Sequence, residues 1–204
     1  MSRAASIVAA AGVALVVVGG TVVTIAFRGG ISARREPSAI EARVARALRT
    51  WAIPSEARDA PNPFQASPRV LAAGLAHFAD HCASCHANDG SGQTAIGRNL
   101  YPRAPDLRHP ATQGLTDGEL FYIIENGVRF TGMPAWAGPG SAEGSWHLVH
   151  FIRHLPKLDG GERAQMEALN PKSPDEWRAL QDEESFLRGD EPPPREPGHG
   201  GHTH

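Results

Sequence analysis

The segment Cys82-Ala83-Ser84-Cys85-His86 constrains this chain more than any other feature of its sequence. The Cys-x-x-Cys-His pattern is typical of a site where haem is attached covalently. Side chains three or four residues apart share one face of a helix, so both thiols can add to the vinyl groups of one haem and His86 can turn its imidazole under the iron. A zinc site would need two further ligands, and the chain has only two cysteines. The motif therefore predicts one covalent haem; the alternatives are a dithiol redox site, for which no βαβ pattern is evident, and a chance match.

A second axial ligand for the iron is also predicted. Met133 stands in the sequence Gly132-Met133-Pro134, about fifty residues after His86. Glycine permits a close backbone approach and proline fixes φ, so these neighbours suit a stiff loop that holds a thioether against a metal. The alternative is that Met133 fills a gap in the core, which is the role expected of Met166 in its polar helical segment.

Several segments carry a resemblance to a known family. They are residues 74–86, 89–92, 115–121, 126–128 and 132–134, followed by an expected closing helix over 146–155. In this order they resemble a class I cytochrome c domain of the small, single-haem bacterial type, over residues 68–156. The resemblance implies an all-α cytochrome c fold of three to five helices around one haem c. It also implies that the first and last helices cross near Gly74 and Phe78, with Phe151 or Trp146 opposite.

The resemblance also suggests groups around the haem. The family pattern has a proline-rich loop that lines the haem, here residues 100–107, where a backbone carbonyl such as that of Pro105 accepts a hydrogen bond from Nδ1 of His86 and fixes its tautomer. Trp136 follows the loop of Met133 and is a further candidate. Three arginines are candidate partners of the haem propionates, each with a solvated surface position as the alternative: Arg98, Arg103 and Arg129.

The first 28 residues are expected to form a transmembrane anchor. No charged residue occurs from Ala4 to Phe27, and a run of this length can span a bilayer as a helix. A cleaved signal peptide is the alternative. Arg28, Arg34, Arg35 and Arg43 follow the run, which by the positive-inside rule favours a cytoplasmic body. The resemblance implies the opposite, since bacterial c-type cytochromes mature outside the inner membrane, and we expect a single-pass anchor with a periplasmic haem domain.

The remaining chain divides by composition into three further segments. Within residues 29–67, a capping box at Ser38 begins a helix with apolar residues at helical spacing, and a proline-rich linker follows. This linker is expected to wrap the haem domain or to act as a semi-rigid spacer. That helix is expected to lie on a membrane surface or, alternatively, to pack on the haem domain. Residues 157–190 are expected to be a polar helical extension. Residues 191–204 are expected to be a disordered tail, with weak transition-metal binding possible at three histidines: His199, His202 and His204.

The predicted ligands indicate electron transfer. With His86 and Met133 both bound, the iron has no open position, which favours one-electron exchange over oxygen chemistry. We expect an electron carrier between a quinol-oxidising complex or dehydrogenase and a terminal oxidase or reductase. The alternatives are a dedicated cytochrome subunit of a membrane oxidoreductase and a protein that senses or handles a metal such as copper. No other catalytic motif occurs, so an enzyme acting by itself is not expected, and a formal charge of −2 without a basic patch argues against nucleic acid.

Overall fold

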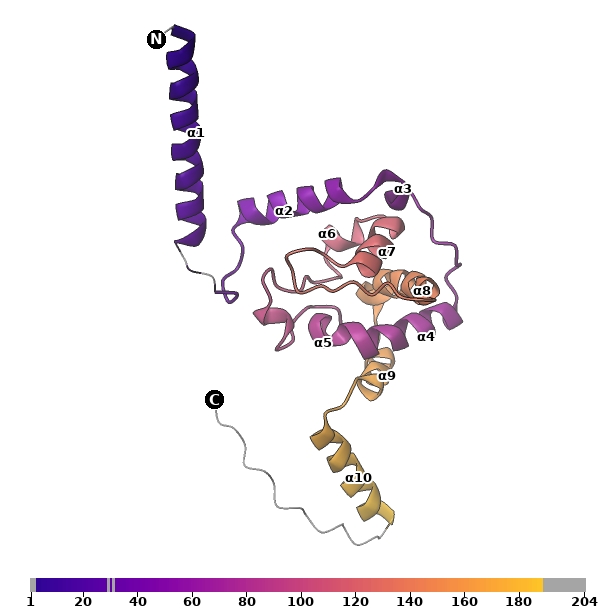
Figure 1. Cartoon of the computed structure of the whole chain (residues 1–204). Coiled ribbons are helices and arrows are strands. Elements are labelled where there is room, and N and C mark those ends of the chain that lie inside the picture. Colours follow the sequence, from indigo (N-terminus) through magenta and orange to yellow (C-terminus); the bar gives the residue numbers. More distant parts are fainter. Residues whose placement is uncertain (1–2, 29, 31, 189–204) are drawn as a thin grey trace.

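All regular structure in the described part of the chain, residues 3–28, 30 and 32–188 of the computed structural model, is helical. The central body (Figure 1) consists of α4 (Pro68–His77), the π-helical turn η1 (Phe78–Cys82), α5 (Ala83–His86), the 3-10 turn η2 (Gly97–Asn99), α6 (Pro110–Gln113), α7 (Asp117–Asn126), α8 (Ser141–His154) and the 3-10 turn η3 (Leu155–Lys157). Before it come α1 (Arg3–Phe27), α2 (Ala39–Ala52) and α3 (Ser55–Arg58), and after it α9 (Gly160–Leu169) and α10 (Pro174–Arg188). The expected all-α body is confirmed.

Helix α1 stands away from the body in Figure 1. Its segment Ala5–Ile25 is long and apolar enough to cross a membrane, and none of it is buried against the rest of the chain. A signal sequence has the same properties, so the helix is a candidate for either role.

Local capping interactions define several helix ends. The Ser67 hydroxyl accepts a hydrogen bond from the backbone of Val70, and Pro68 occupies the first turn of α4. Thr116 and Glu119 form a reciprocal capping box at the start of α7, which ends at Gly127 with a φ of 66°. Helix α8 begins at Ser141, earlier than the sequence predicts, because Gly140 turns the chain with a φ of 82° and thereby starts a further helical turn.

The core of the body is the crossing of α4 and α8. A Cβ atom at Gly74 would lie 2.5 Å from the backbone oxygen of His147 and 2.8 Å from Cβ of Phe151, so only glycine allows the two backbones to come this close. Next to this contact the rings of Phe78 and Phe151 pack with centroids 5.3 Å apart. Trp146 stacks instead on Phe121, at 4.1 Å.

The segment between α2 and α4 wraps the body. A Cβ atom at Gly118 of α7 would lie 2.0 Å from the backbone oxygen of Ala57, which shows how closely α3 approaches α7. The side chain of Asn62 donates a hydrogen bond to the backbone oxygen of Trp146 in α8, at 3.1 Å. On the other side α9 contributes Met166, which is completely buried in the core. Residues on both sides of the segment 68–156 in the sequence thus pack against the body.

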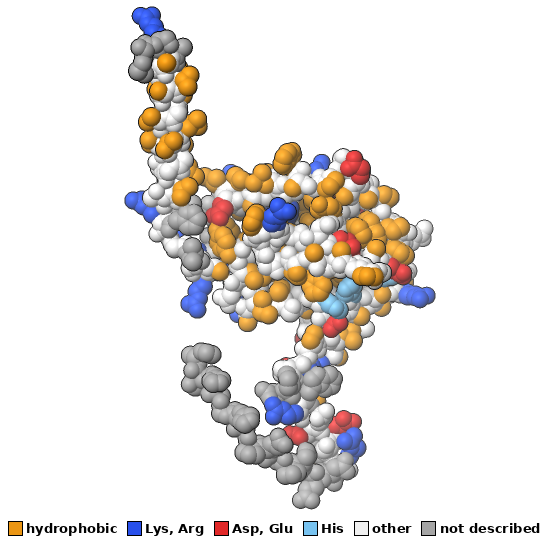
Figure 2. Space-filling view, in the orientation of Figure 1, with side chains coloured by type: hydrophobic (Ala, Val, Ile, Leu, Met, Phe, Trp, Pro, Cys, Tyr) orange, Lys and Arg blue, Asp and Glu red, His pale blue; other side chains and the backbone are white. Residues whose placement is uncertain are grey.

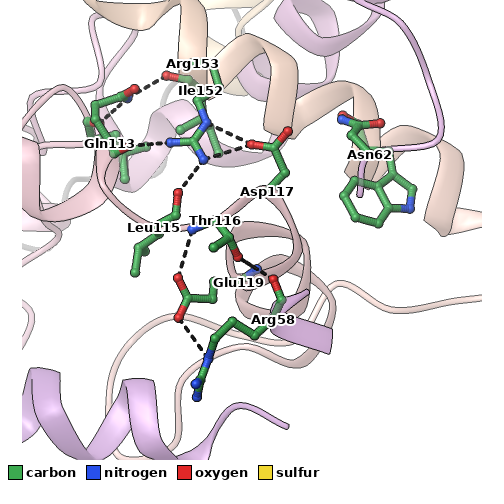
Figure 3. A network of polar contacts seen from close by, with 11 residues as sticks. Arg58, Asn62, Gln113, Leu115, Thr116, Asp117, Glu119, Ile152 and Arg153 are labelled. Carbon is green, nitrogen blue, oxygen red and sulfur yellow. Dashed lines mark hydrogen bonds and ion pairs between the residues drawn. The ribbon is translucent and has the colours of Figure 1, made fainter. Parts of the chain in front are cut away.

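A polar network connects this segment and the residues between α6 and α7 to the helices (Figure 3). The guanidinium of Arg153 donates to the backbone oxygens of Gln113 and Leu115 and pairs with Asp117 at 2.8 Å. Nε of Arg58 lies 3.5 Å from Oε1 of the buried Glu119. The network therefore connects α3, the end of α6, the loop of residues 114–116, α7 and α8.

Substitution of Gly74 tests the helix crossing. Gly74→Ala should lower the free energy of unfolding by about 1–3 kcal/mol, because the new methyl group meets backbone that cannot move aside, even though alanine favours a helix by about 1 kcal/mol over glycine. Denaturant unfolding of the haem-loaded protein in detergent, followed by helical circular dichroism, measures the change. Gly160→Ala is the matched control, since nothing lies within 4 Å of a Cβ atom there. Equal stability of the two variants would contradict the packing argument.

Candidate haem-binding site

The two cysteines lie at a π-helical turn within a continuous helical segment: Cys82 is the last residue of η1, and Cys85 lies in α5. Helix α4 runs without a break through η1 into α5, and the extra residue of the π turn rotates the following side chains by about 100° around the axis. Ala79 and Ala83 are buried against the core, whereas Cys82 and Cys85 are half-buried free thiols. Burial, and to a lesser extent the neighbouring Cys85, raises the pKa of Cys82 to about 12, so this thiol is protonated at neutral pH.

His86 ends α5 with a ring that is oriented by one backbone group. Its Nδ1 lies 3.4 Å from the carbonyl oxygen of Pro105. Burial lowers the pKa of His86 more than this contact raises it, which favours a neutral imidazole. A neutral ring that donates through Nδ1 carries its lone pair on Nε2, for which no hydrogen-bond partner occurs among the described residues. Nε2 is thus free to bind a metal.

The loop between His86 and Pro105 is held close to the motif. The backbone nitrogen of Gly92 donates to the oxygen of His86 at 2.8 Å, and Thr94 Oγ1 donates to the oxygen of Cys85 at 3.2 Å. At Gly97 a Cβ atom would lie 2.2 Å from that same Cys85 oxygen. Sequence analysis missed Thr94 and Gly97, because a single threonine or glycine in a loop carries no signal of the contact that it makes.

Met133 lies in a loop that is closed by its own hydrogen bonds. The nitrogen of Val128 donates to the oxygen of Met133, and the nitrogen of Met133 donates to Oγ1 of Thr131, each at 3.1 Å. Gly127 has a φ of 66°, and a Cβ atom there would lie 2.7 Å from the Met133 oxygen. The Met133 side chain is half-buried. The backbone around this thioether is therefore fixed, as the flanking glycine and proline suggest.

The Met133 loop meets the proline-rich loop that contains Pro105. Leu100 packs over Gly132, where a Cβ atom would lie 2.6 Å from the leucine Cδ2. This contact brings together the two segments that carry the predicted iron ligand Met133 and the carbonyl that faces His86. The site is thus bounded by α5 and by two loops in contact.

Phe130 is an unexpected feature of this region. Its side chain is 92% exposed and its φ is 62°, a conformation that bulky residues rarely adopt. It occupies the third position of a turn in which the nitrogen of Thr131 donates to the oxygen of Val128 at 3.2 Å, and some turns of this kind require a positive φ there. Nothing in the sequence indicates this conformation.

The other predicted contact residues lie in different surroundings. Arg103 pairs with Glu36 at 2.6 Å and donates to the backbone oxygen of Arg34 at 3.3 Å, so the structure engages it with the segment before α2. Arg98 and Arg129 are exposed, and Trp136 packs edge-on against His81 with centroids 5.3 Å apart. Their roles as partners of the haem propionates stay predictions.

Two further histidines in the described part of the chain make polar contacts within the protein. His150 contacts the backbone oxygen of Phe64 at 2.7 Å, and His154 contacts Glu162 at 2.8 Å. Residues 3–28, 30 and 32–188 contain no cluster of three or more His, Cys, Asp or Glu side chains that could hold a metal ion. The tail histidines predicted to bind metal lie outside the described residues: His199, His202 and His204.

The donor set fits a covalently bound haem. Two thiols stand three residues apart at the end of a helix, followed by an imidazole whose Nε2 is free, and a thioether is available from a fixed loop. Residues 69–152 match the family model described as "Cytochrome C oxidase, cbb3-type, subunit III". The matched residues include the motif, the helix crossing at Gly74 and both loops. Over these residues, which make up under half of the chain, the protein is similar to a c-type cytochrome domain, which implies covalent haem c and supports a haem-based role in electron transfer.

Proposed function

We propose that the protein is a membrane-anchored electron carrier with one haem c, attached through Cys82 and Cys85 and ligated by His86 and Met133. The observation that carries this proposal is the orientation of His86, whose Nδ1 faces the Pro105 carbonyl and whose Nε2 is free. When bound, haem c supplies reversible one-electron exchange between ferric and ferrous iron.

The protein's own residues fix the surroundings of that exchange. The Pro105 carbonyl holds the His86 ring in one orientation and raises its basicity as a ligand. The closed backbone around Met133 presents the thioether with little freedom to move away. If His86 and Met133 both hold the iron, no position would be left for oxygen, and the thioether ligand would raise the reduction potential.

We assign α1 as an anchor in the bacterial inner membrane, with the haem domain in the periplasm. Support comes from the length and apolar composition of Ala5–Ile25 and from the need of a c-type domain for maturation outside that membrane. The electron donor would be a quinol-oxidising complex or a dehydrogenase, and the acceptor a terminal oxidase or reductase.

A dedicated subunit of a membrane oxidoreductase is the second candidate function. The family that matches residues 69–152 is described as an oxidase subunit, which favours this possibility. Purification in mild detergent distinguishes the two functions, since a subunit copurifies with partners in fixed stoichiometry and a free carrier does not.

Replacement of the cysteines tests covalent attachment. Cys82→Ala or Cys85→Ala alone should weaken covalent capture, and the double variant should retain no haem after acid–acetone extraction and a denaturing gel stained for haem. Each thiol forms one thioether bond, so the losses should add. Haem that stays covalently bound in the double variant would exclude these residues as the attachment site.

Replacement of Met133 tests the sixth ligand. Met133→Leu should abolish the weak far-red charge-transfer band of iron–thioether ligation, open the iron to carbon monoxide, and lower the reduction potential by on the order of 0.1 V. Met166→Leu is the matched control. Met166 is buried in the core, so this substitution should leave the band and the potential unchanged.

Two results would contradict this ligation. Loss of the band in Met166→Leu together with its survival in Met133→Leu would show that Met166, and not Met133, is the ligand. Ready binding of carbon monoxide by the unmodified protein would show an open iron position, and a sensing or catalytic role would then take precedence over electron transfer.

Fractionation and protease access test the proposed location. The protein should sediment with membranes and require detergent for release, and protease added to spheroplasts should digest the haem domain. Full solubility of the native protein would indicate a cleaved signal. Protection of the haem domain from protease would indicate the cytoplasmic orientation that the arginines after α1 favour.

A further inference from the structure

Helix α2 turns its apolar side away from the body of the protein. Four large side chains recur at intervals of four, four and three residues, which places them on one face of the helix: Ile40, Val44, Leu48 and Trp51. Their exposed fractions are 74%, 52%, 57% and 82%. Figure 2 shows apolar side chains along the edge of the molecule where Figure 1 places α2.

The opposite face of α2 contacts the body through small and polar groups. Ala42 and Arg49 are half-buried there, and no residue of the helix is fully buried. The guanidinium of Arg58 donates to the backbone oxygens of Thr50, at 2.7 Å, and Ile53, at 3.2 Å, while the hydroxyl of Tyr101 donates to Glu41. A surface helix of a globular domain normally has the reverse arrangement, with its apolar stripe on the core. The outward stripe therefore needs a different apolar environment.

The position of α2 identifies that environment. Only residues 28–38 separate it from α1, and in Figure 1 α1 rises on the side of the body that α2 covers. The exposed Arg43 lies on the flank of the apolar stripe, where its guanidinium group can reach lipid phosphates while its stem follows the apolar surface. Trp51 at the far end is of the residue type enriched at membrane interfaces.

We propose that the apolar face of α2 lies in the interfacial layer of the bilayer that α1 enters, with Arg43 at the level of the lipid headgroups. The proposal rests on the proposed anchoring by α1. An interfacial α2 would give the haem domain one orientation on the membrane, because the loop that carries Pro105 is bound to this region. Tyr101 of that loop donates to Glu41 in α2, and Arg103 pairs with Glu36 just before α2.

A photo-crosslinking amino acid at Leu48 tests the proposal in the full-length, haem-loaded protein. The probe, p-benzoylphenylalanine, is introduced at Leu48 and, in a second variant, at Val44. Each variant is irradiated in native membranes and in vesicles of phosphatidylethanolamine and phosphatidylglycerol. Probes at Val16 in α1 and at the exposed Arg163 in α9 are the controls, because Figure 1 places α9 on the side of the body opposite α2. The absorption spectrum of the bound haem verifies that each variant is folded.

The expected result is a lipid adduct at Leu48 and Val44, with a yield at least about tenfold above that at Arg163, as for a side chain inserted in the interface. Adducts to another protein or to a second copy of this chain, or yields equal to that at Arg163, would overturn the proposal. If the probe at Val16 forms lipid adducts while those at Leu48 and Val44 do not, α1 is an anchor and α2 does not lie in the interface. If Val16 also fails, the anchoring on which the proposal rests is wrong as well.

Discussion

The close approach of α4 and α8 at Gly74 is the contact on which the rest of the site depends. Helix α4 continues into α5 and so determines where Cys82, Cys85 and His86 lie. Helix α8 holds α7 through the 2.5 Å hydrogen bond from Ser145 to Glu125, and α7 leads into the loop of Met133. Both predicted iron ligands are thus positioned from one crossing, and a change of distance there displaces them relative to each other.

The loops that complete the site owe their shape mainly to backbone contacts. The segment after His86 closes through the carbonyls of Cys85 and His86, and the segment around Met133 closes through Val128 and Thr131. Glycines permit these approaches at positions where a Cβ atom would overlap a carbonyl oxygen. Loops held in this way would keep the proposed ligands in place when the charge of the iron changes, which suits the proposed exchange of electrons.

The sequence predicts those features that depend on neighbouring residues. The capping boxes at Ser38 and Thr116 form within one helical turn, and both occur in the structure. The motif Cys82 to His86 carries its chemistry in its spacing, although the roles of its residues toward haem stay predictions. Features set by distant contacts are not predicted: the earlier start of α8 and the positive φ of Phe130. For the proline-rich stretch the sequence allows either a wrap around the domain or a spacer, and the contact of Asn62 with α8 shows the wrap. For α2 the sequence allows a membrane or a protein surface, and only the packed structure shows which face is turned outward.

The segment between α2 and α4 is proline-rich, yet it is no free tether. Ala57 lies against Gly118, Asn62 binds the backbone of α8, and Arg58 lies beside Glu119. In the proposed arrangement the domain cannot swing out on an extended chain, and it diffuses only as far as its anchor diffuses. Its search for redox partners is then two-dimensional, confined to a thin layer above one membrane. Partners embedded in that membrane experience a high effective concentration of the carrier, whereas soluble ones must come to it.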